Sequence, residues 1–147
     1  LNNEMTDFSM SYQDADGRLV ANRIEPGKRP RSAMSPMIVF RDDKPYMALG
    51  SPGGSAIIND VAKTLIGVLD WRLDIQQAIN LPNRGSRNKT TELEQGTALL
   101  ELIPALELKG HSVVVREFAS GLHGIVIAPD GLQGGADPRR EGTVRGD

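Results

Sequence analysis

Cysteine is absent from this chain, so it can form no disulfide, present no thiol nucleophile and hold no metal through a thiolate. Aromatic residues make up only 4% of the sequence, which leaves few side chains for stacking on nucleic-acid bases. The formal net charge is −2, and this near balance argues against a nucleic acid or an anionic membrane surface as the main partner. No apolar run approaches the ~20 residues that a membrane-spanning helix needs.

What is present suits a single domain over residues 1–147 with a modest core, since 39% of the residues are hydrophobic. The chain begins at Leu1, without an initiating methionine or a signal-like segment, so we expect a processed or truncated piece of a longer polypeptide. Residues 9–30 are polar and rich in turn-forming residues, which predicts a long loop. Loops of this length are uncommon in compact domains unless they are functional or disordered.

Hydrophobic patterning predicts blocks of strands and helices. The expected strands cover residues 36–40, 46–49, 112–116 and 124–128, the first two and the last two forming hairpin-like pairs. The expected helices cover residues 57–69, 74–79 and 97–109. The polar stretch 83–96 is expected to be exposed. Paired strands and paired helices in blocks predict a layered α+β fold and not a repeated βαβ unit.

The helix over 57–69 has the clearest pattern. Its apolar residues fall at spacings that make one broad face, which we expect to be buried. The opposite, polar face is expected to carry Asn59, Asp60, Lys63 and Thr64.

Gly53 and Gly54 lie in the stretch Gly50–Ser55, between an expected strand and this helix. Adjacent glycines at a helix start leave backbone N–H groups open and let a ligand approach the main chain closely. The helix dipole adds partial positive charge there, so the corner can hold a phosphate, a carboxylate or the oxyanion of acyl transfer. The P-loop lysine and the dinucleotide fingerprint are both missing. A plain strand-to-helix turn is the structural alternative.

Three further residues are candidates for binding. Glu4 and Asp7 are three positions apart, and a carboxylate pair can bind an ammonium group, hold a metal or act as acid and base. Solvated acids near a chain end are the simpler interpretation. Ser32 lies in an extended, proline-bounded segment, where its hydroxyl can bind a carboxylate or satisfy an ordinary loop. His111 and His123 lie in no recognisable nucleophile motif and are expected to be structural.

Together these segments resemble the small subunit of gamma-glutamyltransferase (gamma-glutamyltranspeptidase), a family of the N-terminal-nucleophile hydrolase superfamily. The stretches that carry the resemblance, in the order of the family, are Leu1–Ser9, Pro26–Pro36, Gly50–Ser55 and Gly135–Arg139. Each is modest alone, but four in register make a specific signal. The resemblance implies that this chain is the C-terminal part of that subunit and one side of a four-layer αββα sandwich.

In that family a precursor cleaves itself before a threonine, which becomes the nucleophile with its own amine as base. It takes the gamma-glutamyl group from glutathione or a related amide and passes it to water or to an amino acid. The resemblance implies that Glu4 and Asp7 bind the α-ammonium of the glutamyl group and that Ser32 helps to bind its α-carboxylate. The N–H groups of Gly53 and Gly54 would form the oxyanion hole.

The same resemblance implies that the nucleophile lies outside this chain. The expected partners are therefore the large subunit, the remainder of the small subunit and a small-molecule gamma-glutamyl substrate, with no cofactor and no metal. Residues 9–30 correspond to a shortened lid loop. The isolated chain is expected to be inactive and to expose an apolar sheet face. The family is usually exported, which implies a periplasmic or secreted location.

Two positions depart from the family pattern. Ala33 follows Ser32 where two serines are common, and Arg31 stands where an apolar residue is common. These departures keep two alternatives open. One is a related amide hydrolase of the cephalosporin-acylase type, and the other is an inactive fragment.

Overall fold

The structure is a computed structural model that describes residues 4–87 and 90–146. The chain divides into two compact units, Leu1–Ala33 and Met34–Asp147, and each is described here by itself. The expectations of one domain over 1–147 and of a lid over 9–30 stay predictions.

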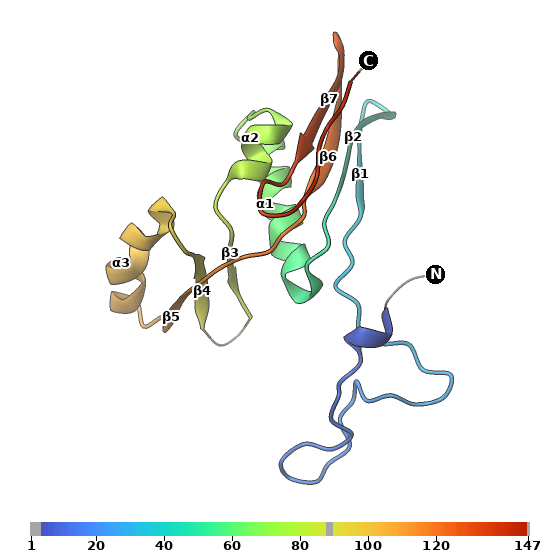
Figure 1. Cartoon of the computed structure of the whole chain (residues 1–147), viewed down its shortest axis with the longest axis vertical. Coiled ribbons are helices and arrows are strands. Elements are labelled where there is room, and N and C mark those ends of the chain that lie inside the picture. The colour runs from blue at the N-terminus through green and yellow to red at the C-terminus, as the bar shows by residue number, and fades with distance from the viewer. Residues whose placement is uncertain (1–3, 88–89, 147) are drawn as a thin grey trace. The chain divides into compact units, whose positions relative to one another are not determined.

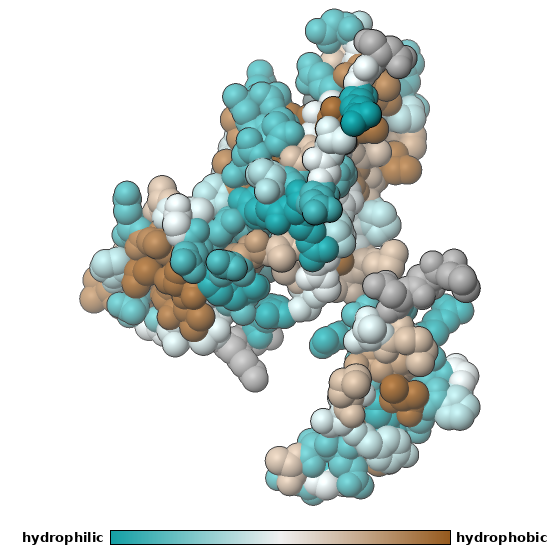
Figure 2. Space-filling view, viewed as in Figure 1, coloured by the Kyte–Doolittle hydropathy of each residue, from teal (hydrophilic) through white to brown (hydrophobic). Residues whose placement is uncertain are grey.

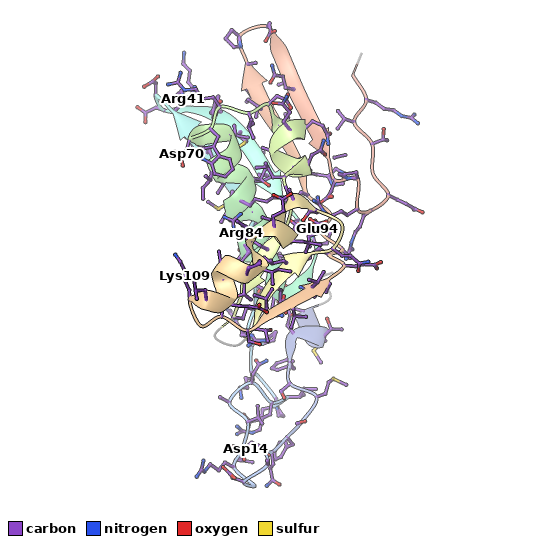
Figure 3. All side chains as sticks on the ribbon, turned by 90° about the vertical axis from the view of Figure 1, so that its left-hand side faces the viewer. Asp14, Arg41, Asp70, Arg84, Glu94 and Lys109 are labelled. Atoms are coloured by element: carbon purple, nitrogen blue, oxygen red, sulfur yellow. The ribbon has the colours of Figure 1, made fainter. Side chains whose placement is uncertain are left out.

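The described part of the first unit, residues 4–33, contains one short helix and an irregular loop. The 3-10 helix η1 spans Glu4–Asp7, and Phe8, directly after it, is buried. The rest of the unit has isolated bridges, Ser9 with Arg23 and Gln13 with Leu19, in place of extended strands. At the loop tip the Asp14 carboxylate accepts hydrogen bonds from following backbone N–H groups (Figure 3). Turn-forming side chains thus replace regular secondary structure here.

The second unit is built on an antiparallel four-stranded sheet in the order β1-β2-β6-β7. Its strands are β1 (Met37–Arg41), β2 (Lys44–Gly50), β6 (His123–Ala128) and β7 (Gly131–Ala136). The expected first hairpin is confirmed, and its two-residue turn, Asp42–Asp43, has positive φ angles of 50° and 59°. Such a turn matches the twist of the flanking strands. The strand β7 was not predicted, because it is rich in glycine.

Helices cover one face of this sheet (Figure 1). They are the short 3-10 helix η2 (Gly54–Ala56), α1 (Ile57–Leu69) and α2 (Ile75–Asn80). The helix α2 begins where Asp74 and Gln77 form a capping box, as the cap signal at Asp74 predicts. Side chains of the helices and of the inward sheet face form the core, whose most buried members include Met47, Val61, Ile75, Ile79 and Leu122.

A second sheet corrects two expectations. It has the order β3-β4-β5, with β3 (Arg84–Ser86), β4 (Thr91–Glu94) and β5 (Val113–Arg116). The strand β5 pairs in parallel with β4, so the expected hairpin-like pairing of 112–116 with 124–128 is wrong. The stretch 83–96 is not simply exposed, because Asn83 and Leu93 are buried. Pairing with a strand distant in sequence, which local polarity does not reveal, decides both outcomes.

The expected helix after Thr97 is present as a 3-10 helix, η3 (Ala98–Leu102), that continues into α3 (Ile103–Leu108). Pro104 lies in the first turn of α3, where its missing N–H costs no helical hydrogen bond. Figure 2 shows apolar surface gathered over α3. Leu102, at the end of η3, is 49% exposed, and Leu108, at the end of α3, is 90% exposed.

The buried face of α1 differs from the expected one. Asp60, Lys63 and Thr64 are buried, whereas Ile58 and Ile66 are 55% and 39% exposed. The helix packs against α2 and the segment that follows it as well as against the sheet, so the polar side chains point into the protein. Spacing alone could not show which neighbours α1 has.

The other face of the four-stranded sheet carries exposed apolar residues, as expected. Ile38, Ala48, Ile125 and Gly134 form one row across the strands, and Ile38 and Ile125 are 65% and 48% exposed. At the end of the row Val144 covers Gly134, where a β-carbon would meet Val144 Cγ1 at 2.4 Å.

Candidate functional site

The turn between β2 and α1 presents open backbone amides. Gly53 and Gly54 have φ angles of 139° and 59°, which residues with side chains rarely adopt. The carbonyls of Gly53 and Gly54 accept hydrogen bonds from Ala56 and Ile57, but within residues 4–87 and 90–146 their N–H groups donate none. No side chain caps η2 or α1 at its N-terminus in this part of the chain. The turn can therefore offer N–H donors to an anion.

The glycine turn is contacted by the segment before β6 and by the connection between β3 and β4. The backbone N–H of Gly121 donates to Ser51 Oγ at 3.3 Å, and a β-carbon on Gly121 would meet Pro52 Cγ at 2.7 Å. Arg87 donates to Ser55 Oγ, so a guanidinium group lies beside the turn. This positive charge adds to that of the helix start.

A buried carboxylate lies directly behind the turn. Asp60 is 1% exposed, and neither of its side-chain oxygens has a hydrogen-bond partner in the described chain. A β-carbon on Gly53 would lie 3.8 Å from Asp60 Oδ2. Burial raises the pKa of Asp60 to about 6, although the positive charge of Lys63 opposes the rise. The acid is thus the least satisfied charged group near the glycine turn.

Lys63, one turn later in α1, is buried too, but unlike Asp60 its charged group has hydrogen-bond partners. Its Nζ donates to the carbonyls of Ile79 and Leu81, at 3.1 Å and 2.6 Å, and to Asn83 Oδ1 at 2.8 Å. Burial lowers the pKa of Lys63 to about 8, and Arg139 nearby lowers it further. Lys63 therefore ties α1 to the end of α2.

Asp137 and Arg139, in the tail motif, complete this buried network. The Asp137 carboxylate accepts from Ser120 Oγ at 2.6 Å and from the Leu122 N–H at 3.1 Å. Burial works to raise the pKa of Asp137, but hydrogen bonds from Ser120, Arg139 and Leu122 outweigh it and hold the pKa below its ordinary value. Arg139 donates from Nη2 to Glu94 Oε2 at 2.9 Å, and Glu94 lies on β4 (Figure 3). The network joins the segments that flank β6 and β7 to the end of β4.

In the first unit, Glu4 and Ser32 line one cavity of about 460 Å³, together with Phe8 and Arg29. Two of the three residues expected to bind substrate therefore lie together. Among the described residues, Asp7 does not line this cavity, but it ends the same 3-10 turn as Glu4. Gly53 and Gly54 belong to the other unit. The roles expected for these five residues stay predictions.

The two histidines each contact a neighbouring polar group. His111 Nδ1 lies 3.2 Å from Thr91 Oγ1, and His123 Nδ1 lies 3.2 Å from the Gly121 carbonyl oxygen. The described residues contain no cluster of three or more side chains suited to hold a metal. No helix formed by the described residues is long and apolar enough to cross a membrane.

Comparison with known proteins decides the family. The sequence model described as Gamma-glutamyltranspeptidase matches residues 1–146. This chain belongs to the gamma-glutamyltranspeptidase family. A curated relative, the glutathione hydrolase proenzyme of Escherichia coli, is 38% identical over 148 aligned positions, which cover 95% of this chain. The Acylase ACY 1 proenzyme of Pseudomonas sp. is 32% identical over 92% of the chain.

Solved structures of the gamma-glutamyltranspeptidase family have the same fold. The enzyme from Pseudomonas nitroreducens complexed with L-DON superposes with a TM-score of 0.83 at 29% identity, covering 100% of this chain and 81% of that one. The T380A mutant from Helicobacter pylori gives 0.79 at 31% identity, covering 95% and 81%. The mixed α and β architecture is thus that of the N-terminal-nucleophile hydrolases, as the resemblance implies.

The chain spans about a quarter of the length of the curated gamma-glutamyltranspeptidase relatives, 25% for the Escherichia coli protein and 24% for the acylase. The chain is therefore a segment of what these proenzymes contain.

Sequence reasoning missed the polar groups behind the glycine turn. The hydrophobic pattern assigns Asp60 and Lys63 to the polar face of the helix, opposite its apolar face, and the resemblance assigns no role to Asp137 or Arg139. A usable signal was present, because an acid and a lysine three positions apart on a strongly apolar helix are candidates for a buried polar cluster. Their partners come from residues 79–83, 94 and 120 and become visible only in the fold.

Proposed function

We propose that this chain is part of an enzyme that transfers or hydrolyses gamma-glutamyl groups of glutathione and related amides. The nucleophile is an N-terminal threonine outside this chain. Glu4 and Asp7 bind the α-ammonium of the donor, and Ser32 binds its α-carboxylate. The N–H groups of Gly53 and Gly54 stabilise the oxyanion that forms when the threonine attacks.

The open amide pair at Gly53–Gly54 is the observation that carries the proposal. Preorganised N–H donors at a helix start are suited to developing negative charge and need no rearrangement during the reaction. Arg87 adds a positive charge beside the same turn. The cavity in the first unit supports the binding roles, because Glu4 and Ser32 line it together and match the two charges of an amino acid. Membership of the family supplies the reaction class.

The test uses the full-length precursor that contains this chain, after autoprocessing. We expect Glu4→Ala with Asp7→Ala to lower kcat/KM for gamma-glutamyl-p-nitroanilide by about 10²-fold or more, because each charge-assisted hydrogen bond contributes about 1.5–3 kcal/mol. Glutaryl-p-nitroanilide is the matched substrate, since it lacks only the ammonium group, and its kcat/KM should hardly change. Asp16→Ala, an exposed acid of the same unit, is the control variant.

The amount of autoprocessed small subunit, read from a gel, normalises each rate. Unchanged preference for the gamma-glutamyl over the glutaryl substrate in the double variant would refute the assigned role of the two acids.

Two departures in the sequence favour one alternative function, an amide hydrolase of the cephalosporin-acylase type. Ala33 removes one hydroxyl, and Arg31 adds a positive charge that suits an acidic acyl group. Among the proteins similar to this chain are an acylase proenzyme and a cephalosporin acylase from Bacillus halodurans, the latter with a TM-score of 0.77 at 26% identity. A wild-type preference for the glutaryl substrate would favour this alternative, and a clear gamma-glutamyl preference would exclude it.

The proposal includes partners and a location. The large subunit and the rest of the small subunit cover the exposed sheet face and supply the threonine, so the isolated chain is inactive. The mature protein is periplasmic or secreted, which fractionation of cells expressing the full precursor would test.

A further inference from the structure

One asparagine connects the two segments that line the cavity of the first unit. Asn22 lies in the loop between η1 and the serine segment, 15 positions after Asp7 and 9 before Arg31. Its side chain Nδ2 donates to the Asp7 carbonyl at 2.6 Å. Its Oδ1 accepts the backbone N–H of Arg31 at 2.8 Å. An amide side chain is one of the few groups that offers a donor and an acceptor in one rigid plane.

Asn22 is itself held by its neighbours. Its backbone carbonyl accepts the N–H of Ser9, two residues after the end of η1, at 2.8 Å. On one side Lys28 Nζ donates to the Ala21 carbonyl at 2.5 Å, and on the other Arg23 is paired with Glu25. These contacts fix the asparagine within a loop that otherwise contains only isolated bridges. The side chain therefore acts as a rigid spacer and not as a loosely attached polar group.

The two contacts reach the backbone next to the cavity-lining residues. Asp7 ends the 3-10 turn that begins with Glu4, and Arg31 directly precedes Ser32. Moving either contact shifts Glu4 relative to Ser32, and both line the same cavity. A ligand that carries an ammonium and a carboxylate on one carbon depends on this spacing, because the acidic turn and the serine segment must meet both of its charged groups at once.

We propose that Asn22 is a positioning residue, which sets the distance between the acidic turn and the serine segment and so determines selectivity for α-amino acid donors. The inference rests on the proposed function of Glu4, Asp7 and Ser32. Asn22 touches neither the substrate nor the reacting atoms in this role, and it acts through the backbone at Asp7 and Arg31.

The experiment uses the autoprocessed full-length enzyme with the variants Asn22→Ala and Asn22→Asp. The first removes both hydrogen bonds, and the second keeps the size and the acceptor for Arg31 while it removes the donor to Asp7. We expect each variant to raise KM for gamma-glutamyl-p-nitroanilide about tenfold or more with kcat changed less than about threefold. The preference over glutaryl-p-nitroanilide should fall by a similar factor.

A merely structural role would lower the amount of active enzyme, which reduces the rates for both substrates equally and leaves KM and the preference unchanged. Gln13→Ala, an exposed side chain of the same loop, is the matched control and should change neither. If Asn22→Ala prevents autoprocessing, the nearly isosteric Asn22→Asp decides the question alone.

The double variant of Glu4 and Asp7 distinguishes failure of the proposed function from failure of the positioning role of Asn22. If it leaves the preference unchanged, the proposed function fails. If it abolishes the preference while both Asn22 variants retain wild-type KM and preference, only the positioning role is overturned.

Discussion

Asp60→Asn tests whether the buried acid behind the glycine turn destabilises the fold when it ionises. Burial raises the pKa of Asp60 from 3.8 to about 6, and the carboxylate is 1% exposed without a partner in the described chain. Because the folded state holds the proton more tightly than the unfolded chain does, the folded form is favoured most below pH 3.8. This contribution is lost as the pH rises through about 6.

The pKa difference between the folded and unfolded chains, about two pH units, corresponds to about 3 kcal/mol in the free energy of unfolding. Asparagine cannot ionise and has nearly the same shape. The stability of the variant relative to wild type should therefore increase by up to about 3 kcal/mol between pH 4 and pH 7.5. The change across this range is the informative quantity, because the cost of burying the neutral side chains is the same at every pH.

Pulse proteolysis in urea suits this measurement, since after autoprocessing the small subunit gives its own band on a gel. The full-length enzyme and its Asp60→Asn variant are compared at pH 4, 5, 6 and 7.5. Asp70→Asn is the matched control, because Asp70 is exposed at the end of the same helix (Figure 3), and a change of less than about 0.5 kcal/mol is expected there. A difference between Asp60→Asn and wild type that stays constant over this range would refute the reasoning.

Two further changes test the packing that supports the site. Gly67→Ala should destabilise the protein by about 1–3 kcal/mol, because the new β-carbon would lie 2.9 Å from Ala78 Cβ where α1 meets α2. The same proteolysis assay measures it, and a stabilised Gly67→Ala variant would contradict this packing. Asp74→Ala removes the cap of α2 and should cost about 1 kcal/mol, whereas Asp74→Asn should retain most of the stability. Equal losses in the two Asp74 variants would show that the cap hydrogen bond is not the source of the stability.

Several parts of this protein could be predicted from the sequence by itself, because each depends on residues that are neighbours in the chain. The hairpin at 37–50 follows from two apolar runs around a polar turn, and α2 follows from the cap at Asp74 and the stop at Pro82. The glycine pair at the start of α1 is equally local, since its open amides depend on the backbone of Gly53 and Gly54. Motifs in a fixed order identified the family without any structure.

Only the tertiary structure decided the rest, because those features depend on residues distant in sequence. The strand β4 is bounded by polar residues and exists through pairing with β3 and β5. Lys63 is buried because the carbonyls of residues 79 and 81 accept hydrogen bonds from its ammonium group. Asp60 is buried although none of the described groups forms a hydrogen bond with its carboxylate. Asn22 connects segments that the sequence separates by a loop. The hydrophobic periodicity of a sequence shows where polar and apolar residues fall along an element. The burial of each residue depends on which other surfaces the fold packs against that element.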